Sequence, residues 1–276
     1  AKQDFFTHLK PTAVAITNID DPYGAAMIEH TVANIHSYGL QDQTAFGSSD
    51  IVASGINYSL HGTSFTIKKR YSDETAQISS KLVGTFNVQN MLAATSALYF
   101  GVEGCSLPAL AELSNTIEPV RGRFEQIVLA NGAVAIIDYA HTPDALENVL
   151  ITIRDLAPMA HITTVFGCGG DRDKTKRPIM GAVAEKYSDR VIITNDNPRT
   201  EDPATIAQEI QDGLSKADAE IILDRAKAIE MALRESTKDT VILIAGKGHE
   251  EYQIIGKERN HFNDKEEVLK FSKTFS

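Results

Sequence analysis

The sequence lacks the features of secreted, disulfide-stabilised and membrane-spanning proteins. Its 276 residues include only two cysteines, Cys105 and Cys168, too few for a disulfide framework or a structural zinc site. No apolar run approaches the roughly 20 residues that a helix needs to cross a bilayer. The first residues, Ala1-Lys2-Gln3-Asp4, do not resemble a signal peptide. We therefore expect a cytoplasmic protein with reduced thiols and no membrane insertion.

Positive charge is also scarce. The chain has 27 Lys and Arg residues against 37 Asp and Glu residues, a formal net charge of -10, which argues against a nucleic-acid partner. Hydrophobic residues make up 42% and charged residues 23% of the chain, as in globular proteins. No internal repeat is visible, and the length suits one large or two ordinary domains.

The first part of the chain is predicted to form a βα unit, then several strands and two helices. Residues 11–17 are short, apolar and β-branched, which favours a buried strand, and the apolar residues of 25–38 fall at helical spacing. Further strands are expected at 43–46, 51–60, 63–68 and 75–83, and helices at 84–100 and 107–117. Because Gly, Ser and Asp separate the strands, we expect a meander in this part of the sheet.

A domain boundary is expected where Pro and Gly interrupt the pattern, in Glu118-Pro119-Val120-Arg121-Gly122-Arg123. This gives domains at 1–118 and 119–276. Asn131-Gly132 then indicates a hairpin of 124–129 with 133–139. Strands at 162–166, 191–194, 220–223 and 240–245 alternate with helices at 143–156, 177–187, 203–214 and 225–235, before a strand pair within 252–262 and a helix at 265–271. The pattern predicts an α/β fold whose second domain has a mostly parallel, Rossmann-like sheet.

Three of these strands end in loops rich in Gly and charge, at 167–178, 196–203 and 246–250. Since the carboxyl ends of parallel strands share one edge of a sheet, we expect the loops to face one ligand. The first two loops carry five cations in an acidic chain, which suggests an anionic ligand. These cations are Arg172, Lys174, Lys176, Arg177 and Arg199.

Neither glycine cluster is a phosphate loop of a standard kind. Gly167-x-Gly169 begins like a dinucleotide-binding fingerprint, but Arg172 occupies the third glycine position. Gly246-Lys247 is followed by Gly248 rather than by Ser or Thr, which excludes a P-loop.

Arg199 and Asn197 lie at a strand-to-helix corner, where a guanidinium can clamp a carboxylate. An ordinary solvated arginine is the alternative. Arg172 on one neighbouring loop and Glu250 on another favour a ligand with both carboxylates and an ammonium, as in an amino acid.

A fourth corner, Asp138-Tyr139-Ala140-His141-Thr142-Pro143, ends a strand and opens a helix with Thr142 at the N-cap. His141 is either a plain corner histidine or part of an anion site at this helix N-terminus. Arg123 is either a linker charge or a side chain that reaches into a cleft between the domains.

Six segments, taken together, resemble the Mur ligase family in the family's order, and within it the branch that adds meso-diaminopimelate. They are Gly84-Thr85-Phe86-Asn87-x-x-Asn90-x-x-Ala93-Ala94, Gly122-Arg123-Phe124-Glu125, Asp138 to Pro143, Gly167 to Pro178, Asp196-Asn197-Pro198-Arg199, and Gly246 to Glu250. The resemblance covers nearly the whole chain. It implies the later part of a central ATPase domain at 1–118 and the C-terminal Rossmann-like domain at 119–276.

The resemblance also implies an ATP-dependent ligase of peptidoglycan synthesis. ATP phosphorylates the terminal carboxylate of UDP-N-acetylmuramoyl-L-alanyl-D-glutamate, the amine of meso-diaminopimelate attacks the acyl phosphate, and phosphate leaves. Such a reaction needs cations against the developing phosphoryl charge and exclusion of water from the acyl phosphate. We expect a monomer.

Residue roles follow from the resemblance alone. Asn90 matches the adenine-contacting asparagine, and three residues match the C-terminal domain's part of the nucleotide site, with His141 also assigned a catalytic role. These three are Arg123, Asp138 and His141. Five residues match the diaminopimelate site: Arg172, Asn197, Arg199, Gly246 and Glu250. Arg199 marks specificity, because lysine-adding relatives usually lack it.

Lys2 resembles the family's carbamylated lysine, which helps to hold Mg²⁺ and is assigned a catalytic role; from the sequence alone it is a solvated terminal lysine. The family's Gly-Lys-Thr phosphate loop and uridine-nucleotide domain would lie before Ala1. We therefore expect a fragment that is inactive alone. The alternatives are a lysine-adding or a D-alanyl-D-alanine-adding ligase, or a binding module without catalysis.

Overall fold

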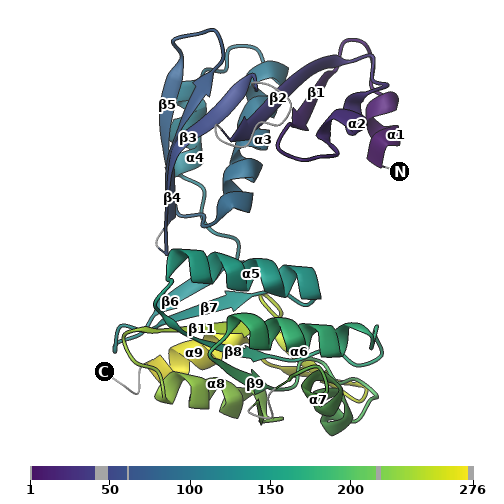
Figure 1. The fold of residues 1–276 in the computed structure, drawn as a ribbon, viewed down its shortest axis with the longest axis vertical. Coiled ribbons are helices and arrows are strands. Elements are labelled where there is room, and N and C mark those ends of the chain that lie inside the picture. The colour runs from purple at the N-terminus through teal and green to yellow at the C-terminus, as the bar shows by residue number, and fades with distance from the viewer. Residues whose placement is uncertain (1, 41–48, 61, 216–218, 273–276) are drawn as a thin grey trace. The chain divides into compact units, whose positions relative to one another are not determined.

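The computed structural model describes residues 2–40, 49–60, 62–215 and 219–272. These divide into two compact units, Ala1–Glu118 and Pro119–Ser276, called the N-terminal and C-terminal units below. Each unit has its own sheet and helices (Figure 1). The strand expected at 43–46 lies outside the described residues.

The N-terminal unit contains one mixed sheet in the order β1-β2-β3-β4-β5. Its strands are β1 (Val14–Asn18), β2 (Asn34–Leu40), β3 (Ile51–Ser59), β4 (Gly62–Lys69) and β5 (Thr75–Ser80). The antiparallel pairs β3–β4 and β4–β5 form the expected meander, but β1–β2 and β2–β3 are parallel. Helices α3 (Thr85–Gly101) and α4 (Leu107–Asn115) contribute the buried side chains of Val88, Leu92 and Leu107 to the hydrophobic core of this unit.

The helix predicted at 25–38 is wrong. The structure has a five-residue helix, α2 (Gly24–Ile28), followed by β2, whose Asn34 pairs with Val14 of β1. Val32 and Ile35, which contributed to the helical apolar pattern, are exposed rather than packed against a core. Ladder pairing with both β1 and β3 therefore overrides a short periodicity that also fits a strand.

The C-terminal unit is built on a six-stranded sheet in the order β10-β9-β8-β11-β7-β6. The strands are β6 (Glu125–Val128), β7 (Val134–Asp138), β8 (His161–Phe166), β9 (Arg190–Ile193), β10 (Glu220–Ile221) and β11 (Thr240–Ala245). All pairs are parallel except the β6–β7 hairpin. The mostly parallel α/β sheet is thus confirmed.

Helices cover both faces of this sheet (Figure 1). α5 (Pro143–Leu156), α6 (Lys176–Tyr187) and α7 (Pro203–Gln211) pack in succession on one face, and α8 (Arg225–Arg234) packs with α9 (Asp264–Ser272) on the other. The side chain of Thr142 caps α5 by accepting from Ala145 N–H, with Pro143 next in the helix. The core joins Ile137, Val165 and Ile244 of three neighbouring strands to Ala228 and Leu233 of α8.

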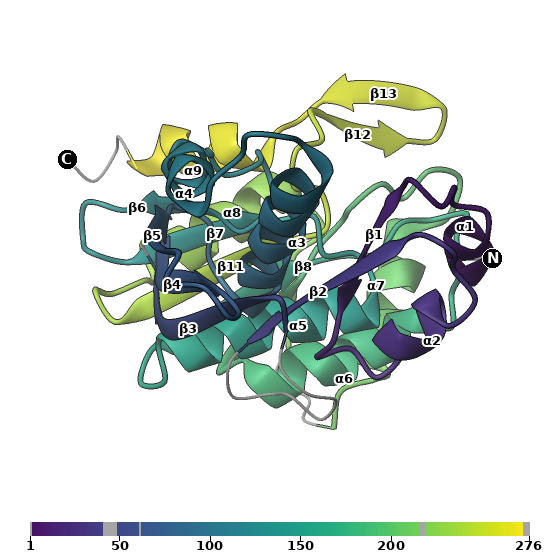
Figure 2. The same ribbon diagram turned by 90° about the horizontal axis from the view of Figure 1, so that it is seen from above.

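A last hairpin, β12 (Tyr252–Ile255) with β13 (Glu258–His261), stands apart from the main sheet. Figure 2 shows it projecting from the helix and sheet layers of the C-terminal unit. None of the helices in the described part of the chain combines the length and apolar character needed to span a bilayer.

Candidate functional site

The three charged loops begin at one edge of the C-terminal sheet. β9, β8 and β11 are neighbours and run parallel, so the loops that follow Phe166, Ile193 and Ala245 leave from the same side. This confirms the predicted arrangement. The corner after Asp138 begins at the same edge, because β7 pairs in parallel with β11.

Asn197 lies at the centre of this edge and is 4% exposed. Its Nδ2 donates to Glu250 Oε2 over 3.0 Å. Its Oδ1 accepts from Lys247 Nζ at 3.0 Å and from the backbone N–H of Ile254 at 2.9 Å. The amide therefore ties three segments together, and the structure brings Asn197 and Glu250 into direct contact.

Arg199 has a left-handed backbone conformation, with φ of 53°, which is uncommon for a residue other than glycine. Its Nη1 donates to Gly170 O at 2.8 Å, and its other guanidinium nitrogens have no partner among the described residues. Such a conformation costs about 1–3 kcal/mol and persists where surrounding contacts enforce it. The guanidinium is thus held at one nitrogen and has donors left for a ligand.

The β12–β13 hairpin supplies those enforcing contacts. Arg199 N donates to Ile254 O at 3.1 Å, and Gly256 N donates to Arg199 O at 2.7 Å. Gln253 Nε2 donates to Asp196 O at 2.9 Å. The hairpin holds the Asp-Asn-Pro-Arg loop along its length, a function that the sequence did not indicate.

The backbone conformation and the close surroundings of residue 246 require a glycine. It has φ of 114°, and a Cβ there would lie 2.7 Å from Asp196 Oδ2. Its N–H donates to Asp138 O at 3.0 Å. Glycine thus allows the β11 loop to pass close to the β9 loop, and Glu250 N then donates to Lys247 O at 2.9 Å within it.

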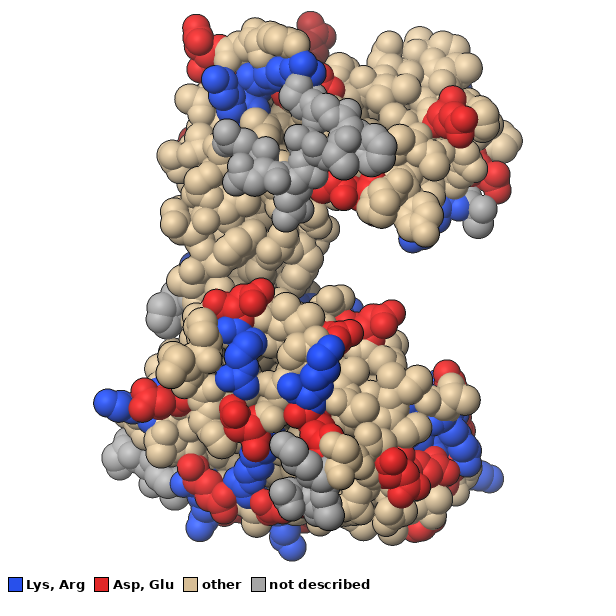
Figure 3. Space-filling model, in the orientation of Figure 1, with Lys and Arg blue, Asp and Glu red and all other residues tan. Residues whose placement is uncertain are grey.

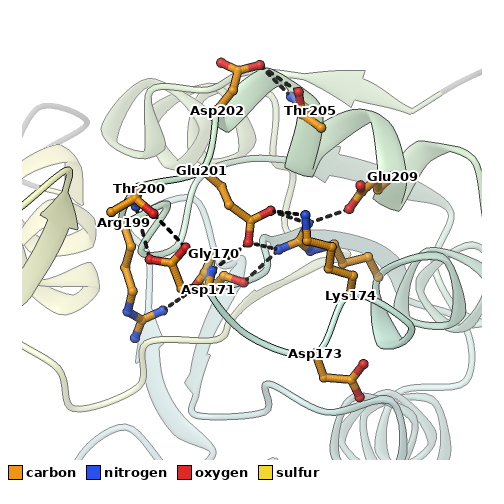
Figure 4. A network of polar contacts seen from close by, with 12 residues as sticks. Gly170, Asp171, Asp173, Lys174, Arg199, Thr200, Glu201, Asp202, Thr205 and Glu209 are labelled. Atoms are coloured by element: carbon orange, nitrogen blue, oxygen red, sulfur yellow. Dashed lines mark hydrogen bonds and ion pairs between the residues drawn. The ribbon is translucent and has the colours of Figure 1, made fainter.

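Arg172 lies on the neighbouring loop after β8 and is exposed. Its Nη1 donates to Asp171 O at 3.2 Å, while Asp171 Oδ1 accepts from Thr200 Oγ1 at 2.8 Å. Gly170 N also donates to Asn197 O at 2.9 Å. The loop of Arg172 is thus tied to the loop of Arg199, and Figure 4 shows two of the bonds between them, Thr200 to Asp171 and Arg199 to Gly170.

The predicted excess of positive charge needs correction. Arg177 is fully buried, donates to both oxygens of Glu201 at 3.0 Å, and also pairs with Glu209. Lys174 Nζ lies 2.9 Å from Glu201 Oε2 (Figure 4). Hydrogen bonds from Arg177 and Lys174 lower the pKa of Glu201 to about 2. Two of the five cations therefore stabilise the loop internally.

One face of the C-terminal unit carries charges of both signs. On the face of the C-terminal unit displayed in Figure 3, Lys and Arg side chains lie beside Asp and Glu side chains. Lys176 Nζ donates to His141 O at 2.6 Å, which links α6 to the corner after β7. Three cations of these loops thus have no carboxylate in salt-bridge contact among the described residues: Arg172, Arg199 and Lys176, of which Lys176 is bound to a backbone carbonyl.

Two family models match this chain. The model of the Mur ligase middle domain matches residues 1–98, and that of the Mur ligase glutamate ligase domain matches residues 122–248. The chain belongs to the Mur ligase family.

Relatives with the name UDP-N-acetylmuramoyl-L-alanyl-D-glutamate–2,6-diaminopimelate ligase are similar over most of the chain. The one from Bacillus cereus is 44% identical over 252 residues, 91% of this chain and 49% of the relative. The one from Clostridioides difficile is 43% identical over 273 residues, which cover 96% of this chain and 54% of the relative. The chain spans about half the length of the curated relatives it matches.

Solved structures agree. A structure with the same ligase name has a TM-score of 0.67 and 34% identity, covering 95% of this chain and 53% of that one. The MurF ligase of Thermotoga maritima in complex with ADP has a TM-score of 0.64 at 18% identity, covering 98% and 56%. The latter likeness shows the Mur ligase fold alone.

The residues that resemble the Mur ligase nucleotide site form a second group in the C-terminal unit. Asp138 accepts from the N–H groups of Phe124 and Ala140, each at 2.7 Å, and burial raises its pKa above the ordinary value. The Arg123 guanidinium lies 4.8 Å from the Tyr139 ring, and the His141 ring lies 4.6 Å from the same ring. Arg123 and His141 are both exposed, so they flank one aromatic side chain at the surface.

Asn90 and Lys2 belong to the N-terminal unit. Asn90 is exposed on α3, and Lys2 is exposed at the start of α1 (Lys2–Thr7). No three His, Cys, Asp or Glu side chains of the described residues are arranged to hold a metal ion. Lys2 is the one described residue that the resemblance assigns to a magnesium site.

Sequence reasoning missed a buried charged layer beneath the site. Arg225 and Asp264 are both fully buried and joined by bonds of 2.7 and 2.8 Å. Burial acts to lower the pKa of Arg225, but Asp264 raises it overall. Arg225 also donates to Ala245 O at 3.0 Å and to Asn195 O at 3.3 Å, so it joins the ends of two site loops. An arginine at the start of a predicted helix gave no signal of this.

Proposed function

We propose that the chain supplies the amino-acid-binding part of a ligase that adds meso-diaminopimelate to UDP-N-acetylmuramoyl-L-alanyl-D-glutamate. The observation that carries the proposal is that two groups of opposite charge lie on loops at the same sheet edge. One is the Arg199 guanidinium, which is bound through one nitrogen to Gly170 O, and the other is the Glu250 carboxylate, which Asn197 holds through one oxygen. The names of the relatives from Bacillus cereus and Clostridioides difficile support this substrate.

The proposed division of labour follows from charge. Arg199 and Arg172 bind carboxylates of the amino acid, since a guanidinium offers paired donors in a plane. Glu250 binds the ammonium at the other end. The reacting amine must lose its proton before attack, so the site has to bind one ammonium and leave the other amine free to be deprotonated.

ATP is the proposed source of the phosphoryl group that activates the substrate carboxylate. The residues offered for the nucleotide are Asn90, Arg123, Asp138 and His141, and the ADP named with the Thermotoga maritima MurF structure supports a nucleotide in this fold. Arg123 and His141 would act by binding and orientation at the Tyr139 ring. Dependence on Mg²⁺ stays a prediction of the resemblance, as does a monomeric state.

The test is calorimetry of meso-diaminopimelate with wild-type chain and with Arg199→Ala. Loss of a charge-assisted hydrogen bond of about 1.5–3 kcal/mol predicts roughly 10- to 100-fold weaker binding. Arg234→Ala, on α8 and paired with Glu230, should bind as the wild type does. Equal affinity of Arg199→Ala and wild type would sink the assignment of Arg199.

The same titration separates the alternatives. A binding module without catalysis should bind the amino acid in the absence of ATP and the uridine nucleotide, whereas a ligase site is expected to bind more tightly when both are present. A lysine-adding site should prefer lysine, which lacks the second α-amino-acid carboxylate. Arg199→Ala should narrow the preference for meso-diaminopimelate over lysine if Arg199 binds that carboxylate.

A further inference from the structure

Lys247 places a buried ammonium directly behind the proposed amino-acid site. Its side chain is fully buried, and its Nζ donates to Asn197 Oδ1 at 3.0 Å and to Tyr252 O at 2.7 Å. Asp196 Oδ1 and Glu250 Oε2 lie 3.7 and 3.6 Å from the same nitrogen. All four acceptors belong to the site loops or to the hairpin that holds them.

These contacts determine which way the Asn197 amide points. Its oxygen receives two donors, Lys247 Nζ and the N–H of Ile254. The reversed amide would place an NH₂ group, which only donates, against two other donors. Asn197 Nδ2 must therefore face Glu250.

The orientation of Asn197 in turn determines what Glu250 offers to a ligand. Oε2 is engaged by Asn197 Nδ2 at 3.0 Å and faces Lys247. Oε1 has no hydrogen-bond partner among the described residues. One carboxylate oxygen is anchored and the other is left for an ammonium.

Packing alone does not explain a lysine at this position. Burying an ammonium carries a desolvation penalty that an apolar side chain of similar length avoids, and burial lowers the pKa of Lys247 below its ordinary value. Methionine has a similar length and would fill much of the same space. Methionine lacks the N–H groups from which Asn197 Oδ1 and Tyr252 O accept hydrogen bonds.

We propose that Lys247 is a positioning residue of the amino-acid site: it orients the Asn197 amide and anchors Glu250, so that Glu250 Oε1 faces the distal ammonium of the ligand. Lys247 itself does not touch the ligand. The role in binding rests on the proposed function, whereas the orientation of Asn197 does not.

The first experiment needs only the wild-type chain without ligand. In a ¹⁵N-edited NOE spectrum, the Asn197 Nδ2 protons should show contacts to the γ protons of Glu250 and not to the ε protons of Lys247. Contacts to Lys247 instead would mean the opposite amide orientation and would overturn the proposal, whether or not any ligand binds.

The second experiment measures affinity for meso-diaminopimelate by calorimetry in three variants. Lys247→Met removes the donor and should weaken binding about tenfold or more. Lys247→Gln keeps a donor group, the amide NH₂, without the charge, and its affinity should fall between those of Lys247→Met and wild type. Lys257→Met, at an exposed lysine in the β12–β13 turn, is the matched control and should bind normally.

The outcomes are distinguishable. A folded Lys247→Met that binds as tightly as wild type refutes the positioning role, and if Lys247→Met does not fold, the comparison of Lys247→Gln with wild type decides. If the wild-type chain binds no meso-diaminopimelate even with ATP and the uridine nucleotide, the proposed function fails. The NOE contacts of Asn197 then still confirm or overturn the orienting role of Lys247.

Discussion

Glu201 shows how a single residue changes the interpretation of a charged loop. It accepts from Arg177, from Lys174 and from the N–H of Asp171 at 2.6 Å. Arg177 in this arrangement is buried rather than directed at a ligand. A count of cations in the loop therefore overstates the charge available for binding, because a carboxylate 24 positions away neutralises part of it.

The pKa of Glu201 predicts an acid-sensitive contribution to stability. The pKa is lowered in the folded state from 4.5 to about 2, so the ionised form stabilises the fold above pH 4.5. This contribution is lost as pH falls from 4.5 towards 2. Glu201→Gln should therefore lower Tm by a few degrees at pH 7, and the difference from wild type should shrink below pH 4.5.

Thermal melts followed by circular dichroism at several pH values provide the measurement. Glu230→Gln makes the same chemical change at a partly buried glutamate that pairs with the exposed Arg234 one helical turn away and should change Tm little. A difference between Glu201→Gln and wild type that stays constant from pH 7 to pH 3 would contradict the expectation.

At the scale of elements, the site is held by short loops that pass close to one another. Gly122 has φ of 67°, and a Cβ there would lie 2.1 Å from His249 N and 2.2 Å from Gly248 C. The segment that carries Arg123 thus packs backbone to backbone against the segment that carries Glu250. A side chain at Gly122 would have to separate the two.

Gly122→Ala is accordingly predicted to destabilise the C-terminal unit by about 2–4 kcal/mol, from the left-handed backbone and the overlap together. Gly256→Ala is the control, because Gly256 also has positive φ, 60°, but no other part of the described chain lies within 4 Å of its Cβ position. It should cost only about 1–2 kcal/mol. Urea unfolding measures the loss of unfolding free energy in both variants. Equal losses would show that the close backbone approach at Gly122 adds nothing to the cost of the substitution.

At the scale of the whole molecule, the two units have separate sheets and separate cores. Every hydrogen bond described above for Asn197, Arg199 and Lys247 lies within the C-terminal unit. All the residues proposed for the amino-acid site therefore lie within residues 119–276, while Asn90 and Lys2 belong to the other unit.

We predict that residues 119–276 fold when expressed alone and bind meso-diaminopimelate within about threefold of the full chain, a difference of less than 1 kcal/mol. Cooperative urea unfolding and calorimetry are the measurements, with Arg199→Ala in the same piece as a negative control. A piece that is unfolded, or folded but unable to bind where the full chain binds, would mean that the N-terminal unit completes the site.

The sequence predicted much of the C-terminal unit because its elements are strongly patterned and well delimited. The boundaries of α5 and β11 match the expectation, and Thr142 acts as the predicted cap. In the N-terminal unit the helix predicted at 25–38 was wrong, because the short apolar pattern of this stretch fits either a helix or a strand. Pairing with β1 and β3, which are separate in sequence, made the choice.

The sequence by itself determined the alternation of strands and helices, the common edge of the three loops, and the presence there of Asn197, Arg199 and Glu250. Those features depend on periodicity and on local turn chemistry. Only the tertiary structure decided which charges are available to bind a ligand. Arg177 is neutralised by Glu201, and Lys247 donates a hydrogen bond to Asn197, which lies 50 positions away in the sequence. A buried charge is acceptable only beside its partners, and the fold alone brings those partners together.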